Sequence, residues 1–337
     1  YCTVWCKRTI TKRSYSVKLS MLSHLVKQPL RCVRPSSYVR HISHKHDFDQ
    51  YCFEAVKTHN YEGFLAGLLL PAQFRGAYYA IHAFNVEIAT IKDQVPRNSA
   101  QAGKIRFQFW KDVFHQIYFE KKLSLSNNQP VAQALNYYIP KHDLTLRWFE
   151  RALEVRFQDM MTPADFSTMD DLEDYAEYSQ SSLLYLTLES MGVKDENTEF
   201  IASHLGVCKG ILTLLRGHPV HQTQGLCYFP REVMKRHALS SRVALKGPTT
   251  EAEASQLKDV VNDLASQAHA HLSKARELSL KGLPPGAHYA LIPSVGLSLY
   301  LDKLHQDDFA LVEDSNTHFH NLKLQARIMQ FLFTKKL

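Results

Sequence analysis

Apolar residues recur at intervals of three and four along most of this chain. The clearest run comprises seven residues: Leu257, Val260, Val261, Leu264, Ala268, Leu272 and Ala275. This spacing places all seven on one face of a helix. Thr250 and Glu253 stand three residues apart just before the run and have the spacing of a capping box, so they predict where that helix begins.

The same spacing extends through six other segments, at residues 74–91, 105–119, 144–157, 172–191, 200–215 and 319–333. Strand-like alternation is scarce. Breaks separate the segments, and one of them, residues 217–230, contains Pro219, which we expect to interrupt a helix. The pattern therefore predicts an all-α protein of about ten helices, folded as a single domain over residues 47–337.

The chain is large enough to bury a substantial core, because 45% of its 337 residues are hydrophobic. No continuous apolar run reaches the roughly 18 residues that a membrane-crossing helix needs, so we expect no such helix. The six cysteines are scattered without the spacing of a metal site, which fits a compartment where thiols stay reduced.

Positive charge is concentrated at the start of the chain. The net charge is +7, but residues 1–46 hold ten of the 40 basic residues and no acidic one, which leaves 30 basic against 33 acidic residues in 47–337. This body lacks the basic surface of a nucleic-acid-binding protein, and we expect no nucleic acid among its partners.

Residues 1–46 have the composition of a mitochondrial targeting presequence, being rich in Arg, Lys, Ser and Thr without acids. The alternative is a basic tail that binds acidic surfaces. Met21 opens a stretch that would be a complete presequence by itself, so we expect residues 1–20 to be upstream sequence. We expect cleavage between Arg40 and Ser43.

Two regions carry a family resemblance. Residues 61–84 contain a Leu-Leu-Leu-Pro turn at 68–71, followed at helical spacing by Arg75 and Tyr79. Further along, a Leu-Leu-Arg sequence ends at Arg216 and a Tyr-Phe-Pro sequence begins at Tyr228. In this order the regions resemble those of the squalene/phytoene synthase family. The resemblance covers about residues 47–335 and implies an isoprenoid-synthase-like helical bundle around a central cavity.

The family condenses prenyl diphosphates, and two Asp-rich motifs hold the Mg²⁺ ions that stabilise the leaving diphosphate. This chain departs from both motifs. In the first, Ala89 and Thr90 replace the leading carboxylates and only Asp93 remains, with Lys92 beside it. In the second, both carboxylates after Arg216 are missing. The resemblance therefore implies a retained fold and a lost reaction, with no catalytic residues, no metal and no cofactor.

Three residues persist from the family pattern and are our candidates for a remnant cavity: Asp93, Arg216 and Tyr228. One alternative is that they bind a lipid, a prenyl chain or a quinone. Another is a residual prenyl transferase activity that uses these three side chains. The simplest alternative is that they only hold the helices together.

The departures themselves resemble one branch of the family, the mitochondrial NADH dehydrogenase (ubiquinone) complex I assembly factors. The matching segments are residues 83–87, 175–177, 179–189 and 266–271. This resemblance implies a matrix protein, peripheral to the inner membrane, whose partners are complex I subunits or other assembly factors. A targeting presequence agrees with that location.

Other chemistry-bearing residues receive a structural interpretation. The run from Asp170 to Asp174 matches the Asp-Asp-x-x-Asp string of prenyl synthases, but it follows Ser167 and Thr168 at the expected start of a helix, where acids favour the helix dipole. His218 and His221 have no cysteine or carboxylate at a suitable spacing, so we expect ordinary surface histidines.

The last predicted helix, about residues 318–336, is amphipathic and basic. Such a helix fits either a terminal helix docked on the core or one that lies on a membrane surface. We favour the docked helix.

Overall fold

The computed structural model describes residues 47–95, 100–122, 129–311 and 317–334. Helices make up nearly all of this part of the chain, and no strand occurs in it. The predicted all-α class is therefore confirmed. The presequence predicted for residues 1–46 lies outside the described residues, and so do the expected upstream segment and the cleavage site.

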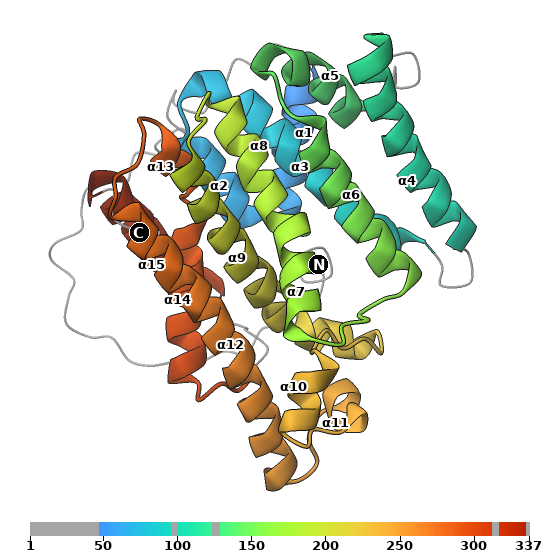
Figure 1. Cartoon of the computed structure of the whole chain (residues 1–337), viewed down its shortest axis with the longest axis vertical. Helices are drawn as coiled ribbons and strands as arrows, with labels where there is room; N and C mark the ends of the chain where they lie inside the picture. The colour runs from blue at the N-terminus through green and yellow to red at the C-terminus, as the bar shows by residue number, and fades with distance from the viewer. Residues whose placement is uncertain (1–46, 96–99, 123–128, 312–316, 335–337) are drawn as a thin grey trace, which may run out of the picture.

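Figure 1 shows how the helices are arranged. In chain order they are α1 (Asp47–His59), α2 (Tyr61–Leu69), α3 (Ala72–Gln94), α4 (Ala100–His115), η2 (Gln116–Glu120), α5 (Pro130–His142), α6 (Leu146–Met161), α7 (Met169–Ala176), η3 (Glu177–Ser181), α8 (Ser182–Ser190), α9 (Glu196–Thr223), α10 (Arg231–Arg236), α11 (Ser241–Lys246), α12 (Glu251–Ser279), α13 (Ala287–Ala290), α14 (Ser294–Gln306) and α15 (Thr317–Thr334).

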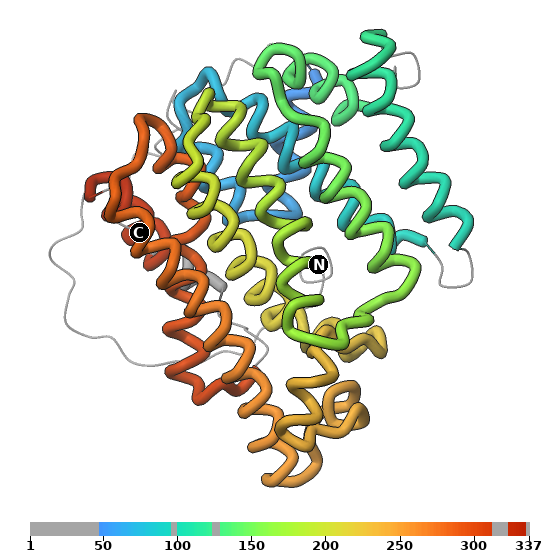
Figure 2. Tube along the Cα trace, in the orientation of Figure 1, coloured from blue at the N-terminus to red at the C-terminus, as the bar shows by residue number. Residues whose placement is uncertain are grey.

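Helix α9 forms the centre of the bundle. It packs along the antiparallel α12 on one side and against α7, η3 and α8 on the other (Figure 2). Helix α3 packs against α1, α5 and α8, and α6 packs against η3 and α8. Helix α9 is long and apolar enough to cross a membrane, but 61% of its most apolar window is buried inside the bundle. Its apolar length is that of a core helix.

Two glycines let α9 approach the preceding π-helical turn η3 and helix α7. A Cβ atom at Gly206 would lie 2.5 Å from the backbone of Ser181, and one at Gly210 would lie 2.6 Å from the Cα of Ala176. Neither contact leaves room for a side chain. The backbones therefore touch along this stripe, and this fixes the position of α9.

Side-chain caps begin several helices where the sequence indicated. Thr168 accepts from the Asp171 amide, and Asp171 accepts from the Thr168 amide, which closes a capping box at the start of α7. Helix α12 begins at the expected place, with Thr250 accepting from the Glu253 amide. The second hydrogen bond of the expected capping box differs. The Glu253 carboxylate accepts from the amide of Thr249 at 2.8 Å, one residue before the N-cap residue Thr250.

The expected helix break at Pro219 was wrong, because α9 continues through it to Thr223. A proline in a helix removes one backbone hydrogen bond, a loss of roughly 3 kcal/mol. On either side of Pro219, the rings of His218 and His221 are buried against the aromatic residues that follow the helix. We attribute the continuous helix to this packing.

Helix α15 is docked on the bundle, as we favoured. Leu324, Ile328 and Phe331 are buried on its inner face, and the helix packs against α14. Met329 and Phe333 lie outside this buried face and remain exposed, Phe333 to 82%. The helix therefore covers part of the core and still presents apolar side chains to its surroundings.

We predict that Gly206→Ala lowers the free energy of unfolding by roughly 1–3 kcal/mol, because the new methyl group meets the Ser181 backbone. Gly296→Ala is the matched control. Its Cβ would lie 3.5 Å from Glu62, an ordinary contact, and alanine is favoured in a helix by up to about 1 kcal/mol. Urea unfolding measures both variants. Equal stability of Gly206→Ala and wild type would contradict the close packing.

Candidate functional site

The position of the first family motif is occupied by an ammonium group. Near the end of α3, Asp93 is exposed, whereas the side chain of Lys92 is largely buried. Lys92 Nζ donates to Asp159 Oδ2 at 2.7 Å and also forms a hydrogen bond with the hydroxyl of Tyr228. Because the two residues are neighbours on α3, they point in different directions, and the amine faces the interior.

Tyr228 and Asp159 complete this cluster, which we call the Lys92–Asp159–Tyr228 cluster. The Tyr228 hydroxyl donates to Asp159 Oδ1 at 2.9 Å. Both side chains are almost fully buried, at 2% and 6% exposure. The buried carboxylate therefore receives hydrogen bonds from an ammonium and a phenol. Such charge-assisted bonds are what keeps an ionised group tolerable inside a protein.

Asp159 was missed by the sequence analysis, although a signal was present. It lies on α6 at helical spacing from Ala152 and Val155, which are both buried. A carboxylate on the apolar face of an amphipathic helix is uncommon, because burying a charge is costly without a partner. That position could have indicated a buried partner of opposite charge.

His218 and His221 lie next to this cluster, and the expectation that they are surface histidines was wrong. The His218 ring stacks on Phe229 with centroids 4.2 Å apart, and the His221 ring lies 4.6 Å from that of Tyr228. Burial lowers the pKa of His218 to about 4. Burial, helped by the charge of Lys92, lowers the pKa of His221 to about 3. Both rings are therefore neutral at physiological pH and pack as aromatic groups.

Arg216 is placed differently from Tyr228. It is exposed on α9, and its Nη1 donates to Glu62 Oε1 of α2 at 2.8 Å. The Arg216 charge lowers the pKa of Glu62. Its guanidinium also lies over the ring of Tyr300 at 5.9 Å. Of the three candidate residues, Tyr228 thus joins a buried cluster, Arg216 joins an ion pair, and Asp93 lies at the surface.

The residues present do not fit the Mg²⁺ ions that the family implies. Mg²⁺ is held by several oxygen ligands in octahedral geometry. In the described part of the chain, no group of three or more His, Cys, Asp or Glu is arranged to hold a metal ion. The carboxylate of Asp159 is engaged by Lys92, whose ammonium supplies the positive charge there.

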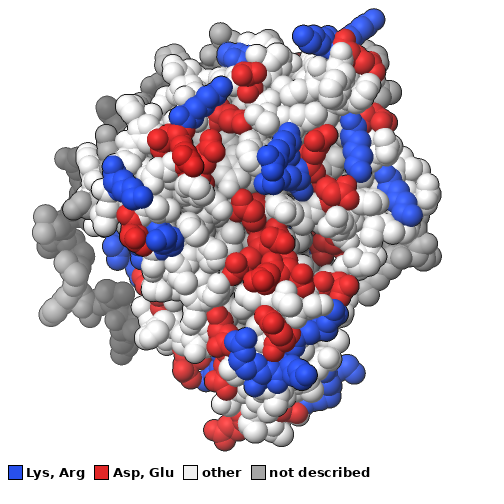
Figure 3. Space-filling model, viewed as in Figure 1, with Lys and Arg blue, Asp and Glu red and all other residues white. Residues whose placement is uncertain are grey.

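The acidic run on α7 has the structural role that we expected. Asp171 closes the capping box, and hydrogen bonds from the Thr168 and Ser167 amides lower its pKa. The Glu173 pKa is lowered by its hydrogen bond with His271 of α12. Figure 3 shows a cluster of acidic residues on the face where α7 lies. The Asp-Asp-x-x-Asp string is therefore a helix start and an interhelical contact.

The squalene/phytoene synthase family model matches residues 56–327, so the chain belongs to the squalene/phytoene synthase family. Among named relatives, it is 39% identical over 79% of its length to "NADH dehydrogenase (ubiquinone) complex I, assembly factor 6" of Bos taurus, covering 77% of that protein. The Homo sapiens protein of the same name is 38% identical over the same shares of both chains.

A solved structure shares the fold. A dehydrosqualene synthase in complex with ligand matches with a TM-score of 0.70 and 20% identity, over 88% of this chain and 98% of that one. The isoprenoid-synthase fold implied by the sequence resemblance is thereby confirmed, and so is the family.

We predict that Lys92→Met lowers the free energy of unfolding by about 3 kcal/mol, because it leaves the buried Asp159 carboxylate without its counter-charge. The double variant Lys92→Met/Asp159→Asn removes both charges and should recover most of that loss. Urea unfolding of the single and double variants measures the difference. A double variant no more stable than Lys92→Met would show that the charge pair is not the cause.

The buried histidines predict a loss of stability in acid. The unfolded chain takes up these protons near pH 6.5, whereas the folded pKa values are about 4 for His218 and about 3 for His221. The two histidines therefore do not reduce the free energy of unfolding above pH 6.5. As the pH drops from 6.5 toward 4, the free energy of unfolding falls by up to about 1.4 kcal/mol per pH unit for each histidine.

His218→Phe keeps the ring stacked on Phe229 and removes one of these titrations, so its stability should fall less steeply between pH 6.5 and 5. Urea midpoints across that range measure the slope. The same substitution at the exposed His269 is the control. Parallel slopes for His218→Phe and wild type would exclude His218 as a source of the acid sensitivity.

Proposed function

We propose that this protein is a non-catalytic assembly factor for mitochondrial respiratory complex I. The observation that carries the proposal is the 39% identity to a relative that is named as a complex I assembly factor, an identity that extends over most of both chains. This match covers 79% of this chain and 77% of the relative. It therefore supports a shared role more strongly than a shared fold does.

We also infer that the protein is a pseudoenzyme. Ionising an allylic diphosphate requires metal ions that bridge its oxygens and stabilise the leaving charge. Ala89 and Thr90 offer no carboxylate for such ions, and Lys92 places an ammonium beside the buried Asp159. A cation fixed to the chain neutralises that acid but offers no coordination sites for a diphosphate.

The proposed location is the matrix side of the mitochondrial inner membrane. The acid-free basic composition of residues 1–46 supports import into mitochondria. Met329 and Phe333 of α15 are exposed apolar side chains and support a peripheral contact with the membrane. We propose complex I subunits or other assembly factors as the protein partners.

We predict that cells depleted of this protein contain less assembled complex I and that both the wild-type chain and Asp93→Ala/Arg216→Ala restore it. Asp93 and Arg216 are exposed, and a surface ion pair such as Arg216–Glu62 contributes about 0–1 kcal/mol, so the double variant should fold. Native gel electrophoresis of mitochondrial membranes measures the assembled complex. Unchanged complex I after depletion would contradict the proposed role.

An assay of the purified protein distinguishes an assembly role from residual catalysis. Incubation of the purified protein with farnesyl diphosphate and Mg²⁺ should release no diphosphate beyond the rate without protein. Mg²⁺-dependent product formation, together with rescue by the wild type alone, would instead establish a working prenyl transferase.

A further inference from the structure

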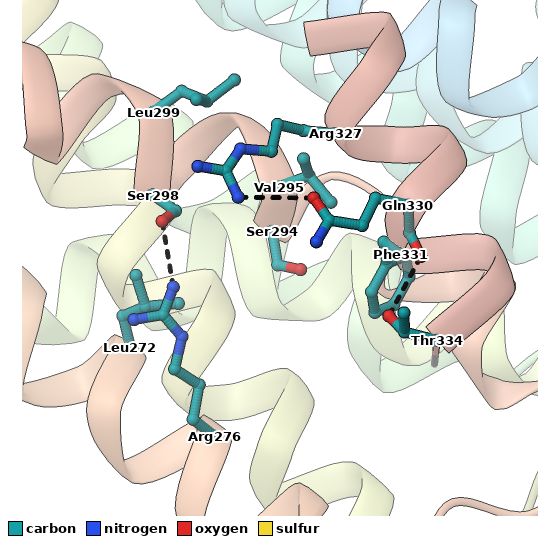
Figure 4. A pocket seen from close by; sticks show the side chains of 10 residues that line it. All are labelled: Leu272, Arg276, Ser294, Val295, Ser298, Leu299, Arg327, Gln330, Phe331 and Thr334. Carbon is teal, nitrogen blue, oxygen red and sulfur yellow. Dashed lines mark hydrogen bonds between the residues drawn. The ribbon is translucent and has the colours of Figure 1, made fainter. Parts of the chain in front are cut away.

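A cavity of about 270 Å³ lies between α12, α14 and α15, away from the residues of the family motifs (Figure 4). Helix α14 presents Ser298 and Leu299 to this cavity. Tyr300 on another face of the same helix contacts Arg216, which belongs to the family pattern. The cavity is therefore a separate feature of the fold, built by the pairing of the last three long helices.

Two arginines enter the cavity from different helices. Arg276 of α12 donates from Nη2 to Ser298 Oγ at 2.9 Å. Arg327 of α15 makes a longer contact of 3.4 Å from Nη1 to Gln330 Oε1. Figure 4 shows both guanidinium groups directed to the side of the cavity where Ser298 lies. Each guanidinium has five N–H donors, so most of them are not used by these two contacts.

Neither arginine is paired with a carboxylate among the residues that the structure describes. Two acids nearby have other partners. Glu277, next to Arg276 in the chain, pairs with Lys274 at 2.9 Å. Glu62, which reaches α14 at Gly296, pairs with Arg216. Two like charges directed to one cavity repel each other, and an anion between them would remove that cost.

The rest of the cavity selects the kind of anion. Ser298 and Gln330 add neutral polar groups beside the guanidiniums, and planar guanidinium forks match phosphate oxygens. Leu272 and Phe331 line the cavity with apolar surface. A volume of about 270 Å³ admits a compact group.

We propose that this cavity binds a phosphate ester, with Arg276 and Arg327 on the phosphate oxygens and the organic part of the ester against Leu272 and Phe331. The ester has two sources that share this chemistry: a soluble phosphate metabolite, or the headgroup of a phospholipid. The proposal goes beyond the assembly role and does not depend on it, because no residue of the cavity belongs to the family motifs.

The first test is calorimetric titration of the purified full chain with glycerol 3-phosphate and with a short-chain phosphatidic acid. The second test is flotation of the same protein with phosphatidylcholine vesicles that contain phosphatidic acid. Arg276→Gln/Arg327→Gln should weaken the binding of whichever probe binds by at least about tenfold, because it removes both charged partners. Lys235→Gln/Arg236→Gln on α10 makes the same change in net charge away from the cavity and should bind as wild type does.

A second variant keeps the test independent of damage to the fold. Ser298→Glu places a carboxylate beside Arg276, where it would substitute for the ligand, so it should abolish binding while raising the melting temperature. Glycerol 3-phosphate binding without flotation would identify a soluble ester, and flotation that requires both arginines would identify a lipid headgroup. No binding of any probe by wild type, or equal loss in the α10 control, would overturn the proposal.

Discussion

The close contact between α9 and the η3 turn is the constraint on which the rest of this structure depends. Gly206 and Gly210 bring the backbone of α9 against Ser181 and Ala176, and no side chain separates them. This contact fixes the axis of the central helix α9 and so fixes the direction of its last turns. Those turns bring His218 and His221 onto Phe229 and Tyr228. The hydroxyl of Tyr228 then meets Asp159 and Lys92.

The Lys92–Asp159–Tyr228 cluster shows how this bundle accommodates a buried charge. A buried carboxylate must be neutralised, and a lysine on the adjoining helix does this from within the chain. The charge is then always present and held at one position. The ion pair thus balances the charge of the interior with groups that the chain itself supplies.

Local rules predicted the helices well, because amphipathic spacing and caps are properties of neighbouring residues. The start of α7 at Thr168 and the docked face of α15 both follow from such patterns. Pro219 could not be judged in this way, since its tolerance depends on rings that pack from beyond the helix. The burial of His218 could not be predicted either, because it depends on Phe229, which folds back onto the histidine after the end of α9.

The site was predicted only in part for the same reason. Motif comparison located Tyr228 but not its partner Asp159, which lies 69 residues away on α6. It also singled out Asp93, although the neighbouring Lys92 is the residue that turns inward. A one-residue step changes the direction of a helical side chain by about 100°, and sequence spacing alone cannot say which neighbour faces the core. The sequence also did not predict that Arg276 and Arg327 line one cavity, because only the tertiary structure brings α12 and α15 to it.

Helix α15 contributes to both the core and the cavity. Leu324, Ile328 and Phe331 cover apolar surface beside α14, and Arg327 supplies one wall of the cavity. Removal of α15 would leave every family motif intact. It would nevertheless uncover the apolar surface beside α14 and take away one of the two guanidiniums. Loss of this helix should therefore impair the protein without touching any residue that the family resemblance identifies.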